Sequence, residues 1–177
     1  MTKLEFLEDQ LLANSIHAAL QRANVYADPK AYTDQNRTTL RGKLAELLRD
    51  LAKQYRTAVT EDKHKENVGK IADDLTTAFG DKNLLRHDRF RIGIAQKALN
   101  LYLKYLWCLN KIGTPPHCPF DFRIIAKLPL TDQQRKCLQW TELDSLKDYQ
   151  TLVDAGMKKI KETVHTSLAE WELTEWK

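Results

Sequence analysis

The segment from Gly93 to Lys111 limits what this chain can fold into more than any other part of the sequence. It contains no proline and reads Gly-Ile-Ala-Gln-Lys-Ala-Leu-Asn-Leu-Tyr-Leu-Lys-Tyr-Leu-Trp-Cys-Leu-Asn-Lys. Wound as a helix, this segment presents apolar side chains on nearly every face, a pattern that is typical of helices surrounded by other elements. We therefore expect it to be the central helix of the fold.

The rest of the chain repeats the helical period, with apolar residues spaced by three and four, and strand-like alternation is nearly absent. We therefore expect a single all-α domain over residues 1–177, with six or seven helices. Serine, threonine and aspartate at helix starts, with glycine and proline at stops, indicate the boundaries. The expected helices run from Leu4 to Ala23, from Asp28-Pro29 through Leu40 to Tyr55, from Thr60 to Gly80, from Gly93 to Lys111, from Asp121 to Leu128, from a Thr131–Gln134 capping box, from a weaker Thr141–Asp144 signal into Leu143 to His165, and from Ser167 and Glu170 through Trp171 and Trp176.

Composition excludes several classes of protein. Apolar residues make up 42% and charged residues 29%, which is unlike a disordered or collagenous chain. The longest apolar stretch, 98–109, is interrupted by Asn100 and Lys104, so we expect no membrane span. Acidic residues near the start argue against a secretory signal, and three cysteines indicate a reducing compartment. We expect a cytoplasmic protein.

Positive charge is concentrated in one segment. The net charge is +4, yet seven bases stand against two acids between Asp81 and Lys111, so this segment alone is +5. Such a local excess indicates a surface for a polyanion if the bases are exposed.

The sequence offers little for a metal centre or a standard cofactor loop. Cys108, His117, Cys118 and Cys137 are spaced by nine, one and nineteen residues, unlike the paired short spacings of zinc sites. The simpler interpretation places Cys108 in the core, His117 and Cys118 on a loop, and His64 on a solvated helix face. Phosphate-binding, nucleophile-elbow and dinucleotide motifs are absent from the sequence, so we expect no metal and no cofactor.

Residues 90–128 resemble a known family. Phe90-Arg-Ile-Gly-Ile-Ala-Gln-Lys97 resembles the hairpin of the helix-hairpin-helix DNA glycosylases, and Pro119-Phe-Asp121-Phe-Arg123 resembles the segment that follows it there. The archaeal 8-oxoguanine glycosylases, with Gln-Lys and a later Pro-x-Asp-x-Arg, are the nearer match. The resemblance implies a helix-hairpin-helix core over 82–128 that binds DNA, removes a damaged base and cleaves the abasic site.

The resemblance also implies roles for individual residues. Lys97 would attack the anomeric carbon and form a Schiff base, while Asp121 would stabilise the positive charge that develops there. The bases would contact the DNA backbone and aromatic side chains would hold a flipped base. The implied backbone contacts are Arg86, Arg89, Arg91, Lys104 and Arg123, and the implied base pocket is Trp107, Phe120 and Phe122.

A second hypothesis assigns no chemistry to these residues. Asp121 is also a good helix cap, and a lysine one turn into a helix is usually a surface group. The chain would then be a noncatalytic helical module that binds a protein or a nucleic acid, with the basic segment, Trp171 and Trp176 as exposed contact surfaces.

Overall fold

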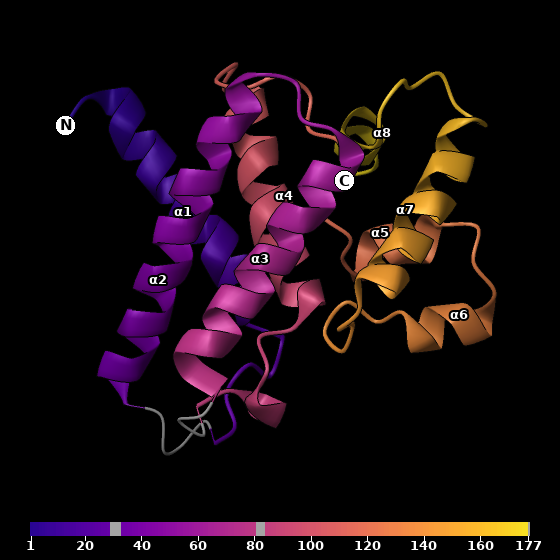
Figure 1. Cartoon of the computed structure of the whole chain (residues 1–177). Coiled ribbons are helices and arrows are strands. Elements are labelled where there is room, and N and C mark those ends of the chain that lie inside the picture. The colour runs from indigo at the N-terminus through magenta and orange to yellow at the C-terminus, as the bar shows by residue number, and fades with distance from the viewer. Residues whose placement is uncertain (29–32, 81–83, 177) are drawn as a thin grey trace.

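The computed structural model describes residues 1–28, 33–80 and 84–176, and its regular elements are helices, as the sequence predicts (Figure 1). Within these residues there are eight α-helices, more than the six or seven expected, and two of them are only six residues long. They are α1 (Lys3–Leu20), α2 (Asp34–Ala52), α3 (Glu61–Phe79), α4 (Ile92–Cys108), α5 (Phe122–Lys127), α6 (Asp132–Cys137), α7 (Leu146–Ile160) and α8 (Leu168–Glu175), with short 3-10 turns at Lys53–Arg56 and Arg86–Asp88.

Most helix starts lie where capping side chains predict them. Thr60, Asp121, Thr131 and Ser167 each accept a hydrogen bond from a backbone amide in the first turn of the helix that follows. At Thr131 the side chain of Gln134 returns the bond, which completes the predicted capping box. Gly80 ends α3 as expected.

Two predicted starts are wrong. Helix α2 begins at Asp34 with Thr33 as its cap, and not at Asp28-Pro29; Pro29 itself lies outside the described residues. Helix α7 begins at Leu146 with Ser145 as its cap, so the expected Leu143–His165 helix is shorter at both ends. Asp144 does not cap α7, because its carboxylate binds Arg89 and the backbone amide of Ile92 instead.

Helix α4 is central, as its apolar sequence predicts. Helices α1, α2 and α3 pack on one side of it, and α5 to α8 gather on the other (Figure 1). Its side chains at Ile94, Ala95, Ala98, Leu99 and Leu103 are completely buried. The molecule therefore has an N-terminal layer and a C-terminal half that meet at one helix.

The C-terminal half contacts a polar stripe on α4 that is formed by Gly93, Gln96, Lys97, Asn100 and Lys104. We call this stripe the α4 seam. Gln96 exchanges hydrogen bonds with the backbone of Phe120 at 2.8 and 3.1 Å, and Asn100 donates to the carbonyl of Cys118 at 2.8 Å. At Gly93 the backbone of Trp140 comes so near that a Cβ would stand 1.8 Å from its carbonyl oxygen. Every residue of the seam thus has a partner in the C-terminal half.

In the described part of the chain, no helix has the length and apolar character to cross a membrane, and no cluster of three metal-binding side chains occurs. All three cysteines are free thiols, but Cys118 is buried while Cys108 and Cys137 are exposed. The expectation that Cys108 lies in the core and Cys118 on the loop surface is therefore wrong. The reason is geometric: the proline-rich segment folds inward against α4, while Cys108 ends that helix.

Candidate functional site

Lys97, the expected nucleophile, is half-buried on the α4 seam. Its ammonium lies 4.0 Å from the ring centroid of Trp140, over the ring face, where cation–π attraction holds it. Burial lowers the pKa of Lys97, the charge of Asp121 opposes this shift, and Arg22 adds to it. The side chain is therefore neither free in solvent nor aimed into an empty cleft.

Asp121, the expected stabiliser, has a structural role that is visible in the geometry. Its Oδ1 accepts hydrogen bonds from the backbone amides of Arg123 and Ile124 at 3.0 and 3.2 Å, which caps α5. Its charge nevertheless reaches Lys97, since it acts on the pKa of that amine. The fold thus brings the two groups into one neighbourhood while giving each another partner.

Four of the five expected DNA-contacting bases already have partners in the chain, and two of them are buried. Lys104 is buried and lies 2.6 Å from the carboxylate of Glu172, and Arg91 is buried with its guanidinium donating to the carbonyl of Ala23. Arg86 pairs with Glu142 at 3.1 Å, while Arg89 pairs with Asp73 at 2.7 Å and Asp144 at 3.2 Å. Counting charge along the segment missed these acids, because they come from distant parts of the chain.

Arg123 is the exception among the five bases. It is exposed, and its guanidinium carbon lies 5.6 Å from the ring centroid of Trp176, where the ammonium of Lys104 also lies, at 4.7 Å. Trp176 is 47% exposed, in line with the contact surface expected of it. Trp171 is buried at 1% exposure, so its assignment to an exposed surface is wrong: it faces the core from α8.

At the start of α4, where the resemblance places the hairpin that would contact DNA, the first backbone amides are already engaged. Residues from Ile92 onward are already helical, and the amides of Ile92 and Gly93 donate to Asp144 and to the carbonyl of Leu143, at 3.2 and 2.8 Å. Phosphate binding by such a turn requires amides that point outward unoccupied. The 139–144 segment fills that position in this chain.

The three aromatic residues expected to hold a base do not converge. Phe120 is fully buried and packs its ring edge-on to Tyr149, so it belongs to the core. Phe122 is 47% exposed and lies edge-on to Trp140, while Trp107 is partly buried near the other end of α4. Of the three, only Phe122 lies close to Lys97, through their shared neighbour Trp140.

A buried chain of tyrosines and histidines was not found by sequence reasoning. The hydroxyl of Tyr55 lies 2.8 Å from Nδ1 of His64, the hydroxyl of Tyr149 lies 3.4 Å from its Nε2, and His117 Nδ1 lies 2.7 Å from Tyr149. His64 and His117 are 0% and 1% exposed, so the expectation that they are solvated is wrong. Lysines flank His64 in sequence, but it points inward from α3 and shares one turn of that helix with Asn67, which is also buried.

Donor and acceptor roles within this tyrosine–histidine network follow from giving as many of the buried polar atoms as possible a partner. Asn67 and Asn100 donate to the hydroxyl oxygens of Tyr55 and Tyr149. With Tyr55 and Tyr149 donating to the Nδ1 atoms of His64 and His117, and His64 Nε2–H donating to Tyr149, the Nε2 of His117 and the Oδ1 of Asn100 remain unpartnered. Both histidines are then neutral. Burial lowers the pKa of His64 to about 4 and that of His117 to about 2.

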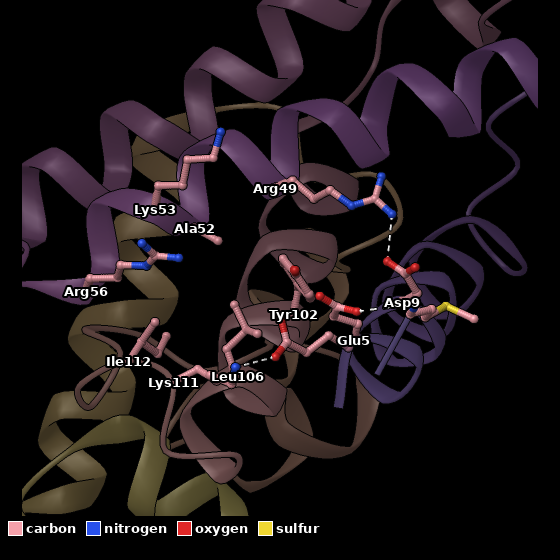
Figure 2. A pocket seen from close by; sticks show the side chains of 12 residues that line it. Glu5, Asp9, Arg49, Ala52, Lys53, Arg56, Tyr102, Leu106, Lys111 and Ile112 are labelled. Carbon is pink, nitrogen blue, oxygen red and sulfur yellow. Dashed lines mark hydrogen bonds and ion pairs between the residues drawn. The ribbon is translucent and has the colours of Figure 1, made fainter. Parts of the chain in front are cut away.

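The described surface is hollowed between α1 and α2. Two adjoining hollows of about 420 and 370 Å³ lie along the boundary between these two helices, and both are lined by Asp9 and Arg49. We call them together the α1–α2 groove. Figure 2 shows the larger hollow, with Arg49 reaching across to Asp9 (2.9 Å), Lys53 and Arg56 farther along the same wall, and Tyr102 on the floor. Leu12, Ala13, Ile16, Gly42 and Ala45 line the smaller hollow.

Packing within the chain does not explain why position 42 is a glycine. A Cβ built there meets nothing within 4 Å, whereas at Gly69, Gly93 and Gly156, the other glycines within helices, it would meet Leu146, Trp140 and Leu168. Glycine in the middle of a helix costs about 1 kcal/mol relative to alanine. The fold gains nothing for that cost at Gly42, and the open space lies in the α1–α2 groove.

Comparisons with known protein families, with curated proteins and with solved structures find no match to this chain.

Proposed function

We propose that this chain is a noncatalytic helical interaction module that binds a helix of a protein partner in the α1–α2 groove. The observation that carries the proposal is Gly42, an in-helix glycine that lines the groove and at which an added Cβ would meet nothing within 4 Å. Small residues permit close approach of a second backbone, and helix-in-groove recognition places an apolar face into such a depression. Leu12 and Ile16 lie beneath this hollow at 2% and 5% exposure, and Ala13 and Ala45 supply the apolar surface that a partner can contact.

The rest of the molecule supports a binding role over a catalytic one. The α4 seam, which includes Lys97 and Lys104, is occupied by contacts with the C-terminal half. Four bases assigned to DNA are engaged with acids or carbonyls of the same chain. A cytoplasmic location belongs to this proposal, because the three cysteines remain thiols.

Selection of helical peptides tests the proposal. A phage-displayed library of amphipathic helices, panned on the immobilised chain, should yield peptides whose binding is at least about tenfold weaker for Gly42→Leu, which fills the groove with a good helix former. Lys43→Leu, on the same helix but outside the groove lining, is the matched control and should bind normally. Failure to enrich any peptide, or hits indifferent to Gly42→Leu, would contradict the proposal.

A second candidate function is an abasic-site lyase that uses Lys97, as the resemblance to the glycosylases implies. Its support is the lowered pKa of Lys97 beside Asp121 and the exposed ring of Phe122 nearby. The neutral amine would attack the anomeric carbon of an abasic sugar, and the resulting Schiff base would permit elimination of the 3′ phosphate.

Reductive trapping separates the two candidates. If the lyase candidate holds, borohydride traps a covalent adduct with abasic-site DNA, Lys97→Gln abolishes it, and the exposed-lysine control Lys136→Gln leaves it intact. DNA binding should also weaken with salt, since phosphate contacts release counterions. Absence of an adduct removes the lyase candidate and leaves the interaction module.

A further inference from the structure

The two ends of the α1–α2 groove carry positive charge that the chain itself does not neutralise. Arg41 lines one end and Arg56 the other. Within the described residues neither forms an ion pair, and Arg41 interacts with the neutral hydroxyl of Tyr26. At the waist between them, Arg49 is already neutralised by Asp9. At the Arg56 end, Glu8 is paired with Lys111 at 2.7 Å and Glu5 with the N-terminal amine at 4.0 Å. The arginines without an acidic partner therefore lie at the two ends of the groove and not along its middle.

The spacing of these two arginines sets a length. Fifteen positions separate Arg41 from Arg56, which at about 1.5 Å per helical residue is about 22 Å, or roughly four helical turns. Between them the wall of α2 that lines the groove includes Gly42, Ala45 and Ala52. Small side chains in the middle and cations at both ends are complementary to a helix with a small apolar centre and anionic ends.

The ion pair at the waist does not block such a helix. Asp9 and Arg49 are each about half exposed, at 53% and 51% of their side-chain surface. Exposed pairs of this kind contribute little to stability, so a partner displaces the pair at small cost. The two hollows then form one continuous groove for the partner helix.

Resting on the proposed function, we infer that the partner segment is an amphipathic α-helix of about four turns with carboxylate side chains at both ends. Its carboxylates pair with Arg41 and Arg56, and its small apolar residues cross Gly42 and Ala45. A helix with basic ends meets like charge at both arginines and binds more weakly for that reason.

Two matched peptides test this inference. Both are fluorescein-labelled and about sixteen residues long, long enough for four turns, with leucine and alanine on one face. One carries two glutamates at each end and the other two lysines. Anisotropy titrations of the whole chain at low salt should show about tenfold tighter binding of the glutamate peptide, a preference that shrinks at high salt as the charges are screened.

Charge reversal assigns the preference to the two arginines. Arg41→Glu with Arg56→Glu should invert it, whereas Lys158→Glu with Lys161→Glu, which changes the net charge equally on α7 and its end, should not. Equal binding of the two peptides, or equal effects of the two double variants, overturns the inference. Library peptides that occupy the groove with basic ends overturn it while leaving the proposed function standing; if no helix binds the groove, both fail.

Discussion

The two sides of helix α4 are joined to the rest of the molecule by different forces. Toward α1, α2 and α3 it presents apolar residues such as Ala98 and Leu99, which are completely buried. Toward the C-terminal half it presents the α4 seam, whose residues make hydrogen bonds, a cation–π contact and an ion pair. Apolar packing tolerates exchange of similar residues, while a buried polar contact is costly as soon as one partner is lost.

This difference teaches where specificity resides in the fold. The N-terminal layer requires only apolar side chains of suitable size, so many sequences satisfy it. The C-terminal half must place particular donors and acceptors, such as the carbonyls of Cys118 and Phe120, opposite Asn100 and Gln96. We therefore expect the seam to respond to substitution in an all-or-none manner that the apolar side does not share.

The largest effect is expected at Lys104. Lys104→Met leaves the buried carboxylate of Glu172 without its cation, and loss of one partner of a buried pair costs about 3–5 kcal/mol of unfolding free energy. Lys104→Met combined with Glu172→Leu removes both charges and should regain most of that loss. Urea unfolding of the two variants measures both values. A double variant as unstable as the single one would show that packing, and not the unpaired charge, causes the loss.

Acid should weaken the polar side of α4 next. His64 and His117 are held neutral with pKa values lowered to about 4 and about 2, whereas unfolded histidine titrates near 6.5. Below about pH 6.5 the unfolded state therefore binds more protons than the folded state, and stability falls with pH. The slope for each histidine rises from about half of 1.4 kcal/mol per pH unit at pH 6.5 to nearly all of it at pH 5, so the two together lose about 3 kcal/mol over this range.

Urea unfolding at several pH values checks this loss. His87→Gln, which changes an exposed histidine, serves as the control and should leave the slope unchanged. Stability that stays flat between these two pH values would mean that the buried histidines are not held neutral.

The close contact at Gly93 gives a smaller, regional effect. Gly93→Ala introduces a Cβ where the carbonyl oxygen of Trp140 would lie 1.8 Å away, so the 139–144 segment must move. Overpacking of this kind costs about 1–3 kcal/mol. Hydrogen exchange should show lost protection in α5 to α8 with protection in α1 to α3 retained. Uniform loss across both regions would mean that the two sides of α4 unfold as one unit.

The sequence predicted the parts of this fold that depend on local physics. The helical period of α4 and the caps at Thr60 and Thr131 follow from neighbouring residues alone. Asp144 was misjudged because its partners, Arg89 and the amide of Ile92, lie more than fifty positions away. The chain brings Lys97 and Asp121 into one neighbourhood, but that neighbourhood depends on Trp140, whose position no local pattern reveals.

The same limit applies to the buried tyrosine–histidine network and to the α1–α2 groove. The inward-facing chain of Tyr55, His64, Tyr149 and His117 joins three distant segments, so no short motif marks it. The groove is likewise formed by two helices that the sequence predicts singly but cannot pair. Gly42 was the one available signal, since a glycine inside a strong helical period is unfavourable unless something needs the space.

The smallest effect, and the one opposite in sign, is expected at Gly42. Gly42→Ala adds a methyl group that touches nothing in the chain and improves helix propensity, so it should raise the unfolding free energy by about 1 kcal/mol, or the melting temperature by about 2–4 °C. Thermal unfolding compared with Gly93→Ala, the same substitution in a helix where backbone stands in the way, gives the contrast directly. If Gly42→Ala instead destabilises the chain, the groove is filled by the fold itself and is no seat for a partner. If Gly42→Ala stabilises the chain, glycine at this position lowers the unfolding free energy without a compensating contact inside the fold. Its role is then explained by a partner that needs the space.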